Sequence, residues 1–236
     1  MIIIWESAFI MANTYRIYPG KIKKLLKTGF IAKELVLLET VDSTNNHAFI
    51  LAKKAFRSEN NDEKDRINGM VIVSEEQSCG KGRFDRKWFS PKGGLWFSII
   101  LNPSIALQTL QHITLIAAAT ISNVLERQYN INVRIKWPND ICFGQKKLAG
   151  ILIESENINS EIIIVIGIGI NVNNAFYRNS DENLSGAISI SDILACKVDM
   201  SIFLAKLLNS FEKSYVDFLN TQDLKSILKD IEIVIN

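Results

Sequence analysis

A glycine-rich basic loop at residues 77–95 has the residue types best suited to chemistry in this sequence. Glycines allow backbone N–H groups to approach an anion closely, cations supply compensating charge, and Trp88 can close an apolar pocket. Basic, glycine-containing turns are also common on protein surfaces. The loop alone therefore leaves an anion site and a solvated turn equally open. The glycines and cations concerned are Gly80, Lys81, Gly82, Arg83, Arg86 and Lys87.

Three later segments carry further reactive or ligand-binding residue types: residues 136–140 (KWPND), 146–154 (KKLAGILIE) and 167–173 (GIGINVN). Arg83 and Lys147 can bring fixed charge to phosphate or carboxylate oxygens, because arginine offers a planar fork and lysine a compact charge. Asp140 offers the hard oxygen that Mg²⁺ prefers beside nucleotide phosphates. Taken singly, a strand lysine is usually solvated, and an Asx-Pro turn usually makes only local hydrogen bonds.

The four segments, together with residues 40–45 (TVDSTN), resemble the biotin protein ligases in order and approximate spacing. The resemblance runs from about Leu35 to about Leu219. Enzymes of that family activate biotin with ATP to biotinyl-5'-AMP, release pyrophosphate, and attach biotin to a lysine of an acceptor protein. The resemblance thus implies ATP and biotin as substrates and Mg²⁺ as cofactor. The implied partner is a biotin carboxyl carrier protein, a subunit of acetyl-CoA carboxylase, or another biotin-dependent carboxylase.

The resemblance also assigns roles to individual residues, with Lys147 and Arg83 as the catalytic pair that holds the acyl phosphate. A neutral cyclic urea with an apolar tail needs a few fixed donors and acceptors in a dry pocket, which these residue types provide. The implied biotin-binding residues are Ser43, Thr44, Gln77, Gly80, Lys81, Gly82, Arg83, Trp88, Lys147 and Gly150. The implied ATP-binding residues are Arg83, Arg86, Trp88, Asn139, Asp140, Lys147 and Asn171, with Asp140 as the magnesium ligand.

Three further residues have competing explanations in the sequence. Gly150 could mark a β-bulge instead of a close approach of ligand to the backbone. Ser43 suits the N-cap of a following helix, and a side chain can both cap and bind. Asn171 follows a Gly-Ile-Gly sequence that could suggest a Rossmann nucleotide loop. That loop is not completed, because Val172 stands at the third glycine position.

Hydrophobic periodicity predicts an α+β architecture with a mixed, largely antiparallel β-sheet flanked by helices. Short turns after residue 143 and after residue 155 leave no room for crossover helices, which favours antiparallel neighbours. The resemblance implies the same fold, the class II aminoacyl-tRNA synthetase-like catalytic fold of biotin and lipoate ligases. The expected strands are 34–40, 70–74, 95–101, 133–136, 141–143, 148–154 and 161–166; the expected helices are 21–27, 44–57, 108–128 and 201–219, with a charged loop at 58–68.

We expect three parts: an N-terminal extension at 1–33, the catalytic domain at 34–220 and a C-terminal remnant at 221–236. Some family members carry an N-terminal helix-turn-helix domain, and residues 1–33 are too short for it, so no nucleic-acid binding is expected. A solvated helix face explains the lysines of this extension better than contact with a membrane surface, so no membrane partner is expected. Most members also carry an SH3-like C-terminal domain, which we expect to be absent or truncated here. We expect translation to start at Met1, with Met11 as the alternative start.

Composition restricts the class of protein. At 236 residues and 47% hydrophobic content, the chain can bury one substantial core, and a net charge of +2 gives no nucleic-acid footprint. Three widely spaced cysteines predict neither a disulfide framework nor a metal site. The apolar start is interrupted at Glu6 and lacks a basic leader, which argues against a signal peptide or membrane anchor. We expect a cytoplasmic monomer or homodimer.

The loop departs from the family pattern at Lys81, Phe84 and Asp85, where the family usually has Arg, Arg and Gly. Two alternatives therefore stay open: a lipoate or octanoate ligase or transferase of the same fold, and a non-catalytic biotin-binding module. A hydrolase is disfavoured, because neither His47 nor His112 lies beside a recognisable nucleophile motif. In a ligase, the loop is expected to order over the acyl adenylate and exclude water.

Overall fold

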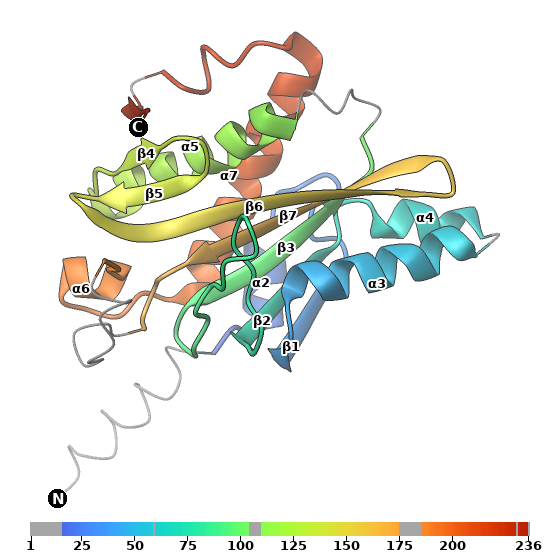
Figure 1. The fold of residues 1–236 in the computed structure, drawn as a ribbon, viewed down its shortest axis with the longest axis horizontal. Coiled ribbons are helices and arrows are strands. Elements are labelled where there is room, and N and C mark those ends of the chain that lie inside the picture. Colours follow the sequence, from blue (N-terminus) through green and yellow to red (C-terminus); the bar gives the residue numbers. More distant parts are fainter. Residues whose placement is uncertain (1–15, 59, 104–109, 175–185, 230, 236) are drawn as a thin grey trace, which may run out of the picture.

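The computed structural model describes residues 16–58, 60–103, 110–174, 186–229 and 231–235 (Figure 1). These residues form an eight-stranded sheet in the order β1-β2-β3-β7-β6-β5-β4-β8. The pairs β1/β2 and β4/β8 are parallel and the other neighbours are antiparallel, which confirms the predicted mixed, largely antiparallel sheet. The strands are β1 Leu35–Val41, β2 Val71–Gln77, β3 Leu95–Leu101, β4 Arg134–Lys136, β5 Asp140–Phe143, β6 Lys146–Ile158, β7 Glu161–Ile170 and β8 Ile233–Val234.

Helices cover both faces of the sheet (Figure 1). Three helices, α2 Pro19–Leu25, α5 Leu110–Tyr129 and α7 Met200–Thr221, lie over one face and bury the larger core against it. Two others, α3 Thr44–Arg57 and α4 Asn61–Ile67, bury a smaller core against the opposite face. Alternation along β2 divides these cores, since Val71 and Val73 join the first and Ile72 the second. The short α6, Ile190–Leu194, is the next described helix after β7 in the chain.

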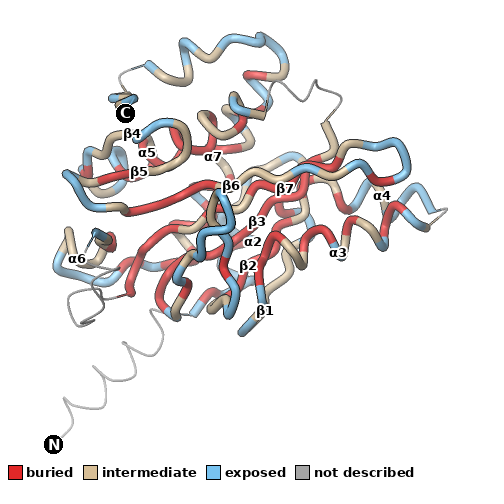
Figure 2. Tube along the Cα trace, in the orientation of Figure 1, coloured by how far each residue is buried: buried red, intermediate tan, exposed pale blue. Residues whose placement is uncertain are grey.

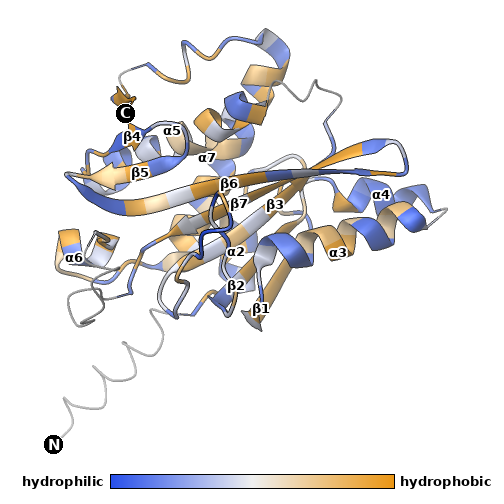
Figure 3. Cartoon of the chain, in the orientation of Figure 1, coloured by the Kyte–Doolittle hydropathy of each residue, from blue (hydrophilic) through white to orange (hydrophobic). Residues whose placement is uncertain are grey.

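Burial follows these layers, with the central strands buried and the outer loops exposed (Figure 2). The hydropathy colouring shows the same contrast: apolar residues dominate the central strands, while the glycine-rich loop in front of them is hydrophilic (Figure 3). The loop therefore stays on the surface of the α3 face instead of joining the core there. That placement keeps its cations accessible to a ligand.

One sequence expectation is wrong: residues 58–68 are not entirely loop but contain α4. The side chain of Asn60 accepts a hydrogen bond from the backbone N–H of Asp62 at 2.9 Å, which caps the helix. Acidic residues in the first turn and basic residues in the last also complement the helix dipole. The strands β2, β6 and β7 are longer than predicted. Hairpin pairing carries β6 through polar residues to Ile158, β7 continues between β3 and β6 to Ile170, and β2 continues beside β1 to Gln77.

The described part of the N-terminal extension packs against α7. Ile17, Ile22 and Ile31 are buried in the larger core. The carboxylate of Glu212 on α7 accepts hydrogen bonds from the backbone N–H groups of Phe30 at 3.0 Å and Ile31 at 2.7 Å. Residues 16–32 therefore stabilise the same core that supports the sheet.

Acid should weaken this junction through Asp199, which caps α7 and pairs with Lys21. Burial tends to raise the pKa of Asp199, but hydrogen bonds from Lys21 and the N–H of Ile202 outweigh burial and lower the pKa below 3.8. A carboxylate whose pKa is lower in the folded than in the unfolded protein stabilises the fold at pH values above its unfolded-state pKa. This stabilisation is lost as the pH falls through the folded-state pKa. We expect Asp199→Asn to lower the urea unfolding midpoint at pH 6, and the difference from wild type to shrink below about pH 4. An unchanged difference at pH 3 would contradict the assignment.

Candidate active site

The site is built on a glycine floor on the α3 face of the sheet. Gly150 of β6 pairs with Gly169 of β7, which in turn pairs with Trp96 of β3. A Cβ atom at Gly150 would lie 2.8 Å from the Trp88 ring, and one at Gly169 would lie 2.7 Å from Trp88 Nε1. The absence of side chains therefore allows the Trp88 indole to lie flat against the two strands.

A cavity of about 140 Å³ opens over this floor between β6, β7, the start of α3 and the glycine-rich loop. It brings together most of the residues that the sequence assigned to a site. The predicted residues that line it are Ser43, Thr44, Gln77, Lys81, Gly82, Arg83, Arg86, Trp88, Asn139, Asp140, Lys147 and Gly150.

The remaining two predicted residues, Gly80 and Asn171, line a neighbouring cavity of about 770 Å³. Trp88 and Lys147 border both cavities. Asn171 is 3% exposed, and its amide is engaged within the protein: Nδ2 donates to the Lys147 carbonyl at 3.3 Å and Oδ1 accepts from Asn174 at 3.2 Å. Reading of an adenine edge by Asn171 therefore stays a prediction.

Neutral donors and acceptors lie where α3 begins. The backbone N–H of Thr44 donates to Gln77 Oε1 at 2.8 Å, and Gln77 Nε2 donates to Ser90 Oγ at 2.8 Å. Ser43 occupies the N-cap position of α3, but its side chain makes no capping hydrogen bond, so that part of the expectation is wrong. The buried Ser43 hydroxyl is thus not committed to the helix.

Two cations enter the cavity from separate segments, as the sequence predicted. Arg83 Nη1 donates to Asn139 Oδ1 at 3.1 Å, and Lys147 Nζ lies 2.8 Å from Asp140 Oδ1. Lys147 Nζ also lies 4.6 Å from the centre of the Trp88 ring, a cation–π contact. The consecutive residues Asn139 and Asp140 therefore hold the two cations toward the same region.

A β-bulge sets the direction of Lys147. On β5, Ile141 and Cys142 are consecutive, but their partners on β6 are Ala149 and Lys147, so Leu148 is the extra residue. Strict alternation would place Lys147 on the face opposite Gly150, whereas the bulge brings both to the same face. Leu148 and Ala149 both remain fully buried on the core side.

Metal-binding residues are sparse. Within the described ranges, no group of three His, Cys, Asp or Glu residues is arranged to hold a metal ion. The cysteines Cys79, Cys142 and Cys196 are free, and burial raises the pKa of the Cys142 thiol. A single carboxylate, that of Asp140, faces the cavity beside the cations, which is the protein contribution that Mg²⁺ needs when phosphates supply its other ligands.

Sequence reasoning missed several residues that shape the cavity: Asn45, Leu152, Gly167 and Gly169. The sequence does contain a pattern that marks the two glycines as part of the site. Gly-Ile-Gly-Ile inside a strand places isoleucine on the core face and glycine on the other, so the alternation itself marks a bare strip of sheet. No comparable signal marks Asn45, whose role depends on contacts with distant strands.

Residues 37–171, more than half of the chain, match the family model described as Biotin/lipoate A/B protein ligase family. The chain belongs to this family. Bifunctional ligase/repressor BirA of Bacillus spizizenii is 34% identical over 91% of this chain, which spans 66% of the length of that relative. The Biotin--[acetyl-CoA-carboxylase] ligase of Paracoccus denitrificans is 28% identical over 75% of this chain and 71% of its own length.

Solved structures give the same assignment. The biotin protein ligase from Aquifex aeolicus, determined in complex with biotin and ATP, has a TM-score of 0.68 and 30% identity, covering 85% of this chain and 78% of that one. The α+β fold expected from the sequence is therefore confirmed as the fold of this ligase family. None of the helices in the described ranges has the length and apolar character needed to cross a membrane.

Proposed function

We propose that this chain is an ATP-dependent biotin protein ligase. One observation carries the proposal: Arg83 and Lys147, from separate segments, converge on a glycine-floored cavity that also contains Ser43, Thr44 and Gln77. The family relationship and the ligands named for the Aquifex structure agree with it. A pocket that combines neutral polar groups with cations matches a urea ring carrying a carboxylate tail.

In the first half-reaction, a biotin carboxylate oxygen attacks the α-phosphorus of ATP, the new O–P bond forms, and the bond to pyrophosphate breaks. The reacting groups are both anionic, so fixed cations must offset their repulsion. Arg83 and Lys147 fill this role, and Trp88 covers the apolar part of the ligand. Asp140 would hold Mg²⁺ that arrives with ATP, and the ion would neutralise phosphate charge.

In the second half-reaction, the amine of an acceptor lysine attacks the acyl carbon, an amide forms and AMP leaves. The acceptor is a biotin carboxyl carrier protein or a similar domain of a biotin-dependent carboxylase. The glycine-rich loop shields the adenylate from water until the amine arrives. The protein acts in the cytoplasm as a monomer or homodimer, with residues 34–220 as its catalytic domain.

Pyrophosphate exchange into ATP tests the proposal directly, with biotin, lipoate and octanoate supplied in turn. Exchange with biotin alone is expected. Exchange with lipoate or octanoate instead would indicate the sister activities of this family. Binding of biotin without exchange would indicate a non-catalytic module.

A further inference from the structure

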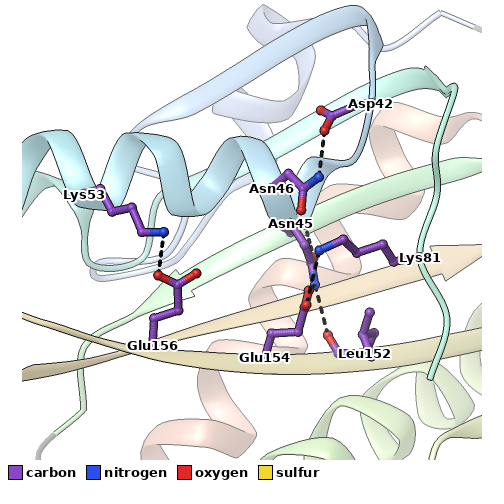
Figure 4. Close-up of polar contacts among 9 residues, drawn as sticks. Asp42, Asn45, Asn46, Lys53, Lys81, Leu152, Glu154 and Glu156 are labelled. Atoms are coloured by element: carbon purple, nitrogen blue, oxygen red, sulfur yellow. Dashed lines mark hydrogen bonds and ion pairs between the residues drawn. The ribbon is translucent and has the colours of Figure 1, made fainter. Parts of the chain in front are cut away.

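A chain of polar contacts joins the glycine-rich loop to β6 beside the candidate active site (Figure 4). Lys81 Nζ lies 3.3 Å from Glu154 Oε1, and Asn45 Nδ2 donates to Glu154 Oε2 at 2.7 Å. One carboxylate thus bridges the loop and the first turn of α3. Lys81 lines the cavity over the glycine floor and also, with Glu154, an adjacent cavity of about 530 Å³.

Asn45 gives this carboxylate a fixed position. Asn45 is 3% exposed, and its Oδ1 accepts a hydrogen bond from Ser98 Oγ at 2.6 Å. Gly167 leaves room for it, because a Cβ atom there would lie 2.3 Å from Asn45 Oδ1. Since both ends of the buried amide are used, Asn45 holds one oxygen of Glu154 and leaves the other directed at Lys81.

We propose that Glu154 is a positioning residue that holds the glycine-rich loop against β6 before ligand binds. The ion pair with Lys81 lies between the loop and the strand that carries Gly150 and Lys147, so it brings the loop over the same stretch of sheet. Glu154 itself does not line the cavity over the glycine floor. Its effect on a reaction, which rests on the proposed function, therefore acts through the loop.

The expected effect is modest, because side-chain exposures of 40% for Lys81 and 31% for Glu154 leave the pair accessible to water. Exposed ion pairs contribute little to stability. Loss of this pair therefore corresponds to about a two- to fivefold change in the equilibrium between the loop held against β6 and the released loop. Prior fixing of Glu154 by Asn45 lowers the entropy lost in forming this pair. We therefore expect the upper part of that range.

The chain offers a matched control. Glu156 lies two residues further along β6, on the same face as Glu154, and pairs with Lys53 of α3 at 2.6 Å. Its exposure of 40% resembles that of Glu154, but its partner belongs to a helix and not to the loop. Glu156→Gln thus removes a similar charge pair from the same strand without touching the loop.

Limited trypsin digestion tests the proposal, because the loop contains Lys81, Arg83, Arg86 and Lys87 as cleavage positions. Without biotin or ATP, Glu154→Gln is expected to raise the cleavage rate within the loop about two- to fivefold, with cleavage sites identified by mass spectrometry. Glu156→Gln should cleave at the wild-type rate. Equal loop cleavage in the two variants overturns the proposal, as does a loss of thermal stability in Glu154→Gln large enough to expose sites throughout the chain.

Steady-state kinetics give a second readout. Glu154→Gln should raise the KM for biotin by the same factor and leave kcat unchanged, since a saturating ligand can order the loop by itself. Glu154→Asp, which keeps the charge, should recover part of the loss. A fall in kcat with unchanged KM would overturn the positioning role. Absence of exchange in the wild type would instead reject the proposed function, and the digestion result would still decide the role of Glu154.

Discussion

Replacing Lys147 by alanine is expected to lower the rate of biotin-dependent pyrophosphate exchange by about 10²–10³-fold. The bulge at Leu148 directs this lysine into the cavity, where its Nζ lies 2.8 Å from Asp140 Oδ1 and faces the region that Arg83 also enters. Loss of one fixed charge at the phosphorus removes stabilisation that increases in the transition state. The exchange rate should fall mainly through kcat.

Lys146→Ala is the control for this prediction. Lys146 is the exposed neighbour of Lys147 at the start of β6 and does not line the cavity. This variant should exchange at the wild-type rate, and both variants should unfold near the wild-type temperature. Retained exchange in Lys147→Ala would remove Lys147 from the catalytic pair and leave Arg83 as the sole candidate.

Adding a methyl group to the glycine floor should weaken biotin binding strongly. In Gly150→Ala, the new Cβ would lie 2.8 Å from the present position of the Trp88 ring and 3.3 Å from Lys147 Cε. A ligand that lies over Gly150 in place of this ring would meet the same methyl group. Overpacking of this kind costs about 1–3 kcal/mol, or about a 5- to 150-fold rise in the biotin dissociation constant. Titration calorimetry measures the change without requiring turnover.

Gly20→Ala is the matched substitution, because no atom lies within 4 Å of the position that its Cβ would occupy. Its biotin affinity should equal that of the wild type. If Gly150→Ala also binds with wild-type affinity, the ligand does not lie over Gly150. The site would then have to be sought in the neighbouring cavity that Asn171 lines.

Much of the framework was predictable because local patterns decide it. The helix at 44–57 and the strand at 95–101 have the bounds that periodicity predicted, since each is regular and clearly bordered. Convergence of Arg83 and Lys147 was also predicted, from the segments that resemble the family. Both line one cavity.

Other features depend on contacts that a sequence does not display. The bulge at Leu148 appears only when β6 is paired with β5, so alternation alone would direct Lys147 to the wrong face. Asn45 reads as an ordinary residue in the first turn of a helix, yet Ser98 and Glu154 from two distant strands bond both ends of its amide. Helix α4 was hidden by its charge, which suggested a loop.

The seating of Trp88 affects how any affinity for this cavity should be interpreted. Its indole lies on Gly150 and Gly169, and its Nε1 hydrogen is buried without an acceptor, an arrangement that costs about 1–3 kcal/mol. A ligand that binds over these glycines replaces the indole ring with its own ring. The Trp88 Nε1–H then leaves its buried position and can donate a hydrogen bond. The measured binding free energy is therefore the difference between the free energy of the bound ligand and that of the displaced Trp88 indole at the same place. Tryptophan fluorescence would follow this exchange directly.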